Sequence, residues 1–202
     1  MTSYPFLEYP PPDGTPRPWP LVLFLHGSGE RGNDLQRVAT QGLPQRAQRG
    51  DRFPFLLVAP QCPRRRWWSI AALAELLDGI LLHRPVDRDR VVLTGVSMGA
   101  DATWALALRQ PERFAAVVPV CGTGDPRRAH RLRDVPVWTF HGARDDIVPI
   151  QDTVKMVAAL REAGAEVRFT VFPDTDHDAW TPAYATDDLY PWMLAQHRRA
   201  PP

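Results

Sequence analysis

The stretch Thr94-Gly95-Val96-Ser97-Met98-Gly99-Ala100 decides how the rest of the chain is interpreted. An apolar run at 90–93 predicts a strand before it, and residues 100–109 predict a helix after it. Glycine, any residue, serine, any residue, glycine between a strand and a helix is typical of a tight turn that exposes the serine hydroxyl. Side chains at the two glycine positions would collide with neighbouring backbone. The pattern predicts Ser97 as a nucleophile, and a glycine-rich turn that merely contains a serine is the alternative.

Length and charge place the chain among ordinary soluble domains. Its 202 residues suit one domain, which we expect to span residues 1–202. The formal net charge of +1 gives no general attraction to nucleic acid or to a membrane. No apolar run has membrane-spanning length, and residues 1–12 lack the pattern of a signal peptide. These features predict a cytoplasmic protein.

The two cysteines, Cys62 and Cys121, each follow an apolar run. Such positions are typical of buried free thiols in a reducing compartment. A single disulfide between them is the alternative.

Apolar runs alternate with helix-like segments along the chain. Buried strands are predicted at 21–25, 55–59, 90–94, 115–120, 135–140 and 167–172, with a possible edge strand at 4–10. Helices are predicted at 35–49 with a break near 42–44, and at 70–83, 100–109, 152–163 and 187–197. This alternation predicts an α/β fold with a mostly parallel sheet of about six to seven strands, flanked by helices on both faces.

Polar candidates follow several of these strands, and parallel sheets bind ligands beyond the carboxyl ends of their strands. A serine hydroxyl needs a base within hydrogen-bond reach, and the base needs an acid to fix its tautomer. His177 is the predicted base because it follows the last strand in a polar setting. The pattern His-Gly-x-x-Asp-x-x-Val-Pro favours Asp145 as the acid, while Asp146 remains the neighbouring alternative.

Three further aspartates surround the predicted base and could serve as its acid: Asp174, Asp176 and Asp178. Aspartate also forms turns, which is the other interpretation of all three. His141 closes a strand and precedes a glycine, so we expect it to have a structural role.

Hydrolysis through a serine also needs donors for the oxyanion of the tetrahedral intermediate. One predicted donor is the backbone N–H of Met98, directly after the nucleophile. The other is the backbone N–H of Ser28, in the glycine-rich loop that follows the first buried strand. In this interpretation the amides of both residues matter more than their side chains.

The residues above resemble those of the α/β-hydrolase superfamily, in which serine, acid and histidine follow in this order. The segments that carry the resemblance are 24–32, 59–62, 95–99 and 111–114. They are similar to the polyhydroxybutyrate-depolymerase, feruloyl-esterase and prolyl-oligopeptidase-like esterases. The resemblance implies a carboxylesterase that works through an acyl-serine intermediate, without a large cap domain. Dienelactone hydrolases of similar size carry cysteine at the elbow, so Ser97 argues against that subgroup.

The expected substrate is a small-molecule ester, and the mechanism needs neither a cofactor nor a metal. Trp68 and Trp180 lie in loops at the predicted site and are candidates for an aromatic wall around the substrate, with packing against the core as the alternative. A peptidase, thioesterase or acyltransferase on the same three residues, or a non-catalytic ligand-binding relative, remains open. The oligomeric state does not follow from the sequence.

Overall fold

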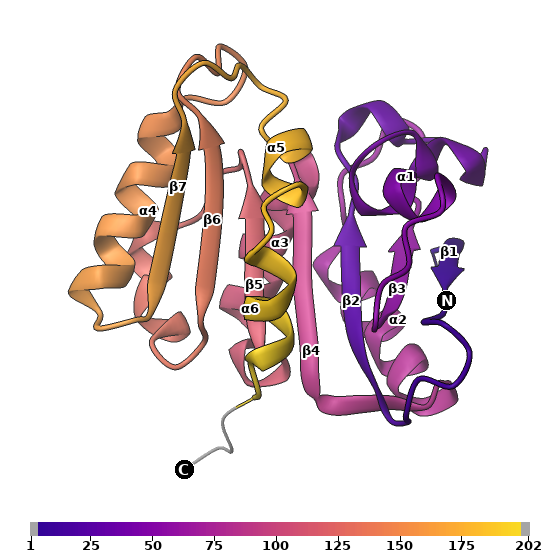
Figure 1. Cartoon of the computed structure of the whole chain (residues 1–202). Coiled ribbons are helices and arrows are strands. Elements are labelled where there is room, and N and C mark those ends of the chain that lie inside the picture. Colours follow the sequence, from indigo (N-terminus) through magenta and orange to yellow (C-terminus); the bar gives the residue numbers. More distant parts are fainter. Residues whose placement is uncertain (1–3, 199–202) are drawn as a thin grey trace.

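The computed structural model describes residues 4–198 and is built around a seven-stranded sheet in the order β1-β3-β2-β4-β5-β6-β7 (Figure 1). β1 runs antiparallel to β3, and the other neighbouring pairs are parallel. The mostly parallel α/β sheet expected from the sequence is therefore confirmed. The strands are Phe6–Tyr9 (β1), Trp19–Leu25 (β2), Leu56–Pro60 (β3), Val86–Val96 (β4), Ala116–Val120 (β5), Val137–Gly142 (β6) and Val167–Phe172 (β7).

Helices cover both faces of the sheet. The α-helices are Gly42–Gln48 (α1), Ile70–His83 (α2), Met98–Arg109 (α3), Ile150–Glu162 (α4), Trp180–Tyr184 (α5) and Leu189–Ala195 (α6). Short 3₁₀ helices are Ser28–Glu30 (η1), Leu35–Thr40 (η2), Pro111–Arg113 (η3) and Pro126–Leu132 (η4). One apolar core packs α2, α3 and α4 against the sheet, and a second packs α1, α5 and α6, which lie in front of the sheet in Figure 1.

The side-chain alternation of β2 shows how one strand serves both cores. Leu21, Leu23 and Leu25 belong to the core beneath α2 and α3, whereas Val22 and Phe24 belong to the core beneath α1. All five side chains are buried. A strand that is apolar on both faces fits only the middle of a sheet that is covered on both sides.

Some predicted boundaries shift for local reasons. The break predicted within the helix at 35–49 is confirmed, since η2 and α1 are separate helices, but it lies at Gln41, just before Gly42 with its φ of +64°. Pro44 lies in the first turn of α1, where its missing N–H breaks no helical hydrogen bond. The predicted final helix is shorter, at 189–195, and the preceding α5 was not expected.

The parallel strands end along one edge of the sheet, at the top in Figure 1, and the loops after β2, β4, β6 and β7 meet there. Cys62 and Cys121 are free and buried, which confirms the prediction of two thiols. Within residues 4–198, no helix is both long enough and apolar enough to cross a membrane.

Candidate active site

The turn between β4 and α3 has the strained shape that its sequence demands. Ser97 has a φ of 53°, in the left-handed region, and is partly exposed between buried neighbours. Its N–H donates to the carbonyl of Val120 at 3.0 Å. A Cβ at Gly95 would lie 2.5 Å from the carbonyl oxygen of Gly99, and a Cβ at Gly99 would overlap that of Leu25. Glycine is therefore required at both positions, and the turn presents the hydroxyl of Ser97.

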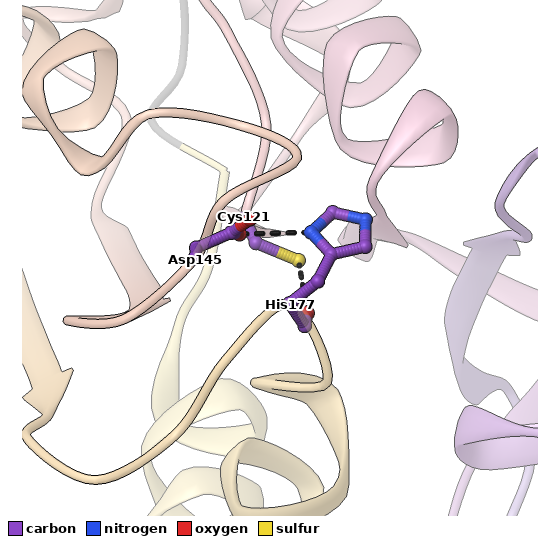
Figure 2. Close-up of side chains that lie close together, drawn as sticks. All are labelled: Cys121, Asp145 and His177. Atoms are coloured by element: carbon purple, nitrogen blue, oxygen red, sulfur yellow. Dashed lines mark hydrogen bonds and ion pairs between the residues drawn. The ribbon is translucent and has the colours of Figure 1, made fainter.

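Three loops bring a serine, a histidine and an aspartate into one hydrogen-bonded chain. His177 Nε2 lies 2.9 Å from Ser97 Oγ, and His177 Nδ1 lies 2.8 Å from Asp145 Oδ2. Figure 2 shows the contact between the imidazole and the carboxylate. Because a carboxylate only accepts, Nδ1 is the donor and Nε2 of the neutral ring is free to accept the serine proton. The three residues follow β4, β6 and β7, as the topology of the sheet predicts.

The Asp145 carboxylate is held by more than the histidine. Its Oδ1 accepts from the N–H groups of Ile147 and Val148 at 2.9 and 2.8 Å, and His141 Nε2 lies 3.2 Å from Oδ2. Burial raises the pKa of this carboxyl, but the hydrogen bonds from His177 and the two amides outweigh burial and lower the pKa overall. The group is therefore ionised and oriented at neutral pH.

The other candidate acids are engaged elsewhere or exposed. Asp146 is exposed. Asp174 pairs with Arg144 at 2.5 Å. Asp176 and Asp178 form turns, since Asp176 Oδ1 accepts from the Asp178 N–H and Asp178 accepts from Thr181 at the start of α5. Among these aspartates, all within the described residues, the one with a hydrogen bond to the His177 ring is Asp145.

A cysteine that sequence reasoning did not connect with the site lies beside this pair (Figure 2). Cys121 follows β5 with a φ of 46°, and its Sγ–H donates to the backbone carbonyl of His177 at 3.4 Å. Ligand atoms of Cys121, Asp145 and His177 lie within 4.8 Å of one another, which is the kind of set that binds zinc. The carboxylate and imidazole atoms are already bonded to each other, however, and burial raises the pKa of the thiol, which disfavours the thiolate a metal needs.

The two segments that carry the predicted oxyanion donors lie next to Ser97. The N–H of Met98 is the first in α3, so it has no partner within the helix. A Cβ built at Gly27 would lie 3.6 Å from the Cβ of Ser97, which places the loop containing Ser28 against Ser97. The structure thus brings the two segments together, and the role of their amides as oxyanion donors stays a prediction.

A shallow hollow of about 170 Å³ opens beside Met98 and is mostly apolar. It is lined by Trp67, Trp68, Ile70, Met98, Asp101, Ala102 and Ala105. Trp68, one of the predicted binding residues, is buried, and its Nε1–H donates to the carbonyl of His26 at 3.2 Å. Trp67, which is 66% exposed, offers the freer surface.

The other predicted binding residue, Trp180, packs edge-on against the ring of His177, with 5.4 Å between ring centroids. A tryptophan in this position supports the imidazole and borders the site. Binding of substrate by Trp68 or Trp180 stays a prediction.

Comparisons with known proteins agree with this geometry. The model of the dienelactone hydrolase family matches residues 70–187. A crystal structure of a thermostable esterase is 31% identical and superposes with a TM-score of 0.83, over 96% of this chain and 59% of that one. The acyl-protein thioesterase 2 of Zea mays is 18% identical with a TM-score of 0.68, over 95% of this chain and 98% of that one, and so supports the fold alone.

A curated relative, described as a putative carboxymethylenebutenolidase of Salmonella typhimurium, is 29% identical over 100 residues. The match covers 45% of this chain and 37% of the relative. The residues matched by the family model include Ser97, so the expectation that a serine at the elbow argues against this family is wrong.

Proposed function

Because the chain belongs to the dienelactone hydrolase family of α/β hydrolases, we propose that it is a serine esterase that cleaves small acyl esters. The observation that carries the proposal is the continuous chain of hydrogen bonds from Asp145 through His177 to Ser97. The hydroxyl of Ser97 donates to Nε2 of His177, and the buried carboxylate of Asp145 sets the tautomer of that ring. That arrangement converts a weak nucleophile into an effective one.

In the proposed reaction, Ser97 Oγ attacks the ester carbonyl while its proton passes to His177 Nε2. The N–H groups of Met98 and Ser28 stabilise the oxyanion of the tetrahedral intermediate. Collapse of the intermediate breaks the bond to the alcohol, which leaves with the proton from His177. Water then attacks the acyl-serine, again with His177 as the base, and releases the acid and free Ser97. Asp145 orients the imidazole and stabilises its positive form throughout.

The substrate side of the proposal rests on the hollow beside Met98. Its lining is mostly apolar and its volume is small, which suits a short acyl group. We therefore expect faster hydrolysis of acetyl and butyryl esters than of long-chain esters. A cytoplasmic location, expected from the sequence, stays a prediction.

The test compares hydrolysis of p-nitrophenyl acetate and butyrate by the wild type, Ser97→Ala and Ser69→Ala. Ser69 caps α2 and is a matched serine outside the site. Ser97→Ala should lose at least about a thousandfold in kcat/KM, and Ser69→Ala should keep wild-type activity. A fluorophosphonate probe should label wild type and Ser69→Ala alone. Equal rates for wild type and Ser97→Ala would contradict the proposal. Acyl-thioester and aminoacyl-amide substrates, assayed in parallel, distinguish an esterase from a thioesterase or a peptidase.

A further inference from the structure

The loop after β2 has an unusual pattern of hydrogen bonds. Each backbone carbonyl from residue 26 to residue 30 accepts from a side chain. The donors are, in order, Trp68 Nε1, His26 Nδ1, Arg31 Nε, Arg37 Nη2 and Gln61 Nε2, at 3.2, 2.6, 2.9, 2.7 and 2.9 Å. In a trans peptide the N–H points away from the C=O, so fixing these carbonyls also fixes the directions of the amides.

The peptide between Gly27 and Ser28 matters most, because it carries the proposed oxyanion donor. The Gly27 carbonyl is held by His26 Nδ1, and His26 Nε2 in turn accepts from the N–H of Cys62 at 2.9 Å. The Ser28 N–H therefore points away from the His26 ring. Gly27 itself lies against Ser97. The direction of this one amide depends on how rigidly the whole loop is held.

Gln61 is a buried side chain that holds the loop with two hydrogen bonds. It is 1% exposed, and its Nε2 donates to the carbonyls of Glu30 and Asp34 at 2.9 and 2.7 Å. Its Oε1 is buried and has no hydrogen-bond partner within the described residues. Burying the amide oxygen without a partner costs free energy. The contribution of Gln61 to the structure therefore lies in its two hydrogen bonds to the loop carbonyls.

The segment around Gln61 clamps the loop at both ends. The N–H of Cys62 bonds to the His26 ring at the start of the loop, and the Cys62 carbonyl accepts from the N–H of Gly32 at 3.0 Å at its end. Arg37, an exposed side chain on η2, reaches back to the Gly29 carbonyl in the middle. The sequence segment at 59–62, which the resemblance singled out, thus acquires a physical role.

We propose that Gln61 and Arg37 are positioning residues for ester hydrolysis: they hold the loop so that the Ser28 N–H faces the developing oxyanion. Neither side chain has a hydrogen bond to Ser97 or His177 among the contacts of residues 4–198, so both act through the loop. The inference rests on the proposed function. It adds that transition-state stabilisation depends on side chains outside the reacting groups.

The experiment uses Gln61→Met, Arg37→Met and Arg37→Lys in the full chain, with p-nitrophenyl butyrate as substrate. Displacing one oxyanion donor by a fraction of an ångström should lower kcat about 10- to 100-fold in Gln61→Met and about 3- to 10-fold in Arg37→Met. KM should change less than about twofold, because the donor acts mainly in the transition state. Arg37→Lys should recover part of the loss, since it keeps a donor on a long side chain.

A second measurement separates positioning from general damage. Butylboronic acid forms a tetrahedral adduct with an active serine and should bind these variants more weakly, by a factor similar to the loss in kcat. Butyrate, a product without a tetrahedral oxyanion, should inhibit all variants equally. A purely structural role would leave the ratio of these two inhibition constants unchanged.

Two controls match the changes in chemistry. Thr139→Val removes a buried hydrogen bond of 2.9 Å to the Pro119 carbonyl, and Arg161→Met alters an exposed arginine on α4. Both should keep the wild-type kcat and boronate affinity. If Gln61→Met does not fold, Arg37→Met decides the question.

The outcomes separate this inference from the function beneath it. Wild-type kcat and boronate affinity in folded Gln61→Met and Arg37→Met would overturn the positioning role alone. A wild-type protein without Ser97-dependent hydrolysis would overturn the proposed function together with this inference.

Discussion

Two adjacent aspartates show how much one position matters at the scale of the residue. Asp145 has its side chain fully buried and bonded to His177, whereas Asp146 is exposed. Asp145→Asn should lower kcat about 10³- to 10⁴-fold, because an amide in this place favours the wrong tautomer of the imidazole. Asp146→Asn should stay within about threefold of the wild type. Steady-state kinetics of the pair test the assignment, and the reverse ranking would make Asp146 the acid.

His26 links the loop after β2 to the stability of the fold. Burial lowers the pKa of this histidine from 6.5 to about 4, so the unfolded chain gains a proton at a higher pH than the native protein does. Its contribution to stability is complete above about pH 6.5 and is lost as the pH falls towards 4, by roughly 3 kcal/mol in all. Burial of Glu30 acts in the opposite sense: it raises the pKa of that carboxyl and weakens the fold as the pH rises.

We therefore expect the difference in free energy of unfolding between wild type and His26→Gln to shrink as the pH falls from 7 to 4.5. Urea denaturation at several pH values measures this difference. At pH 7 the variant should be less stable than the wild type, because glutamine cannot reproduce the two hydrogen bonds of the imidazole, to the Gly27 carbonyl and from the Cys62 N–H. A difference that is independent of pH would show that His26 is not the group responsible.

At the scale of the element, the close approach of α3 to β2 positions Ser97, the proposed nucleophile. A Cβ at Gly99 would overlap the carbonyls of Leu25 and His26, so Gly99→Ala must push the start of α3 away from the loop after β2. We expect a loss of about 2–4 kcal/mol in stability and at least a hundredfold loss in kcat. Gly79→Ala in α2 is the control, because its Cβ meets nothing within 4 Å and alanine favours a helix. Thermal melts and kinetics of both variants test the contrast, and near-wild-type activity of Gly99→Ala would contradict it.

A secondary-structure element could be predicted where its sequence signal lies within the element itself. The buried strands are continuous apolar runs, and the three polar residues in the hydrogen-bonded chain each follow such a run, so both could be predicted. The first part of β4 was not predicted, because residues 87–90 are charged and do not resemble a buried strand. In the structure they extend the strand back to Val86. The helix α5 is only five residues long and carries no clear helical period.

Side-chain roles that depend on distant partners could not be found in this way. Gln61 lies 31 residues from Glu30, and the sequence contains no sign that they meet. Trp68 is buried and its N–H donates to the His26 carbonyl, yet it also lines the hollow beside Met98. A tryptophan in a loop looks the same in the sequence in either role, so its hydrogen bond to the His26 carbonyl could not be predicted, and its part in substrate binding stays a prediction.

At the scale of the whole molecule, the two ends of the sheet have different roles. The proposed chemistry lies at the carboxyl ends of the strands, and the chain's last described residue is anchored at the opposite end. There Arg198 bonds to the Asp89 carboxylate through Nε and Nη2, at 3.0 and 2.8 Å, and to the Glu112 carbonyl at 3.3 Å. These contacts tie the segment after α6 to the start of β4, at the bottom of Figure 1.

This separation predicts that Arg198→Ala will change stability without changing activity. The ion pair is partly exposed, with side chains 34% and 58% accessible, so its loss should cost about 0.5–1 kcal/mol, and less in high salt. The site lies at the other end of a sheet whose central strands are buried on both faces, so kcat/KM for p-nitrophenyl butyrate should stay within about twofold of the wild type. Urea denaturation at low and high salt, with kinetics on the same samples, measures both quantities. A fall in kcat/KM larger than the loss of folded protein would mean that β4 transmits a change at its start to the turn that carries Ser97.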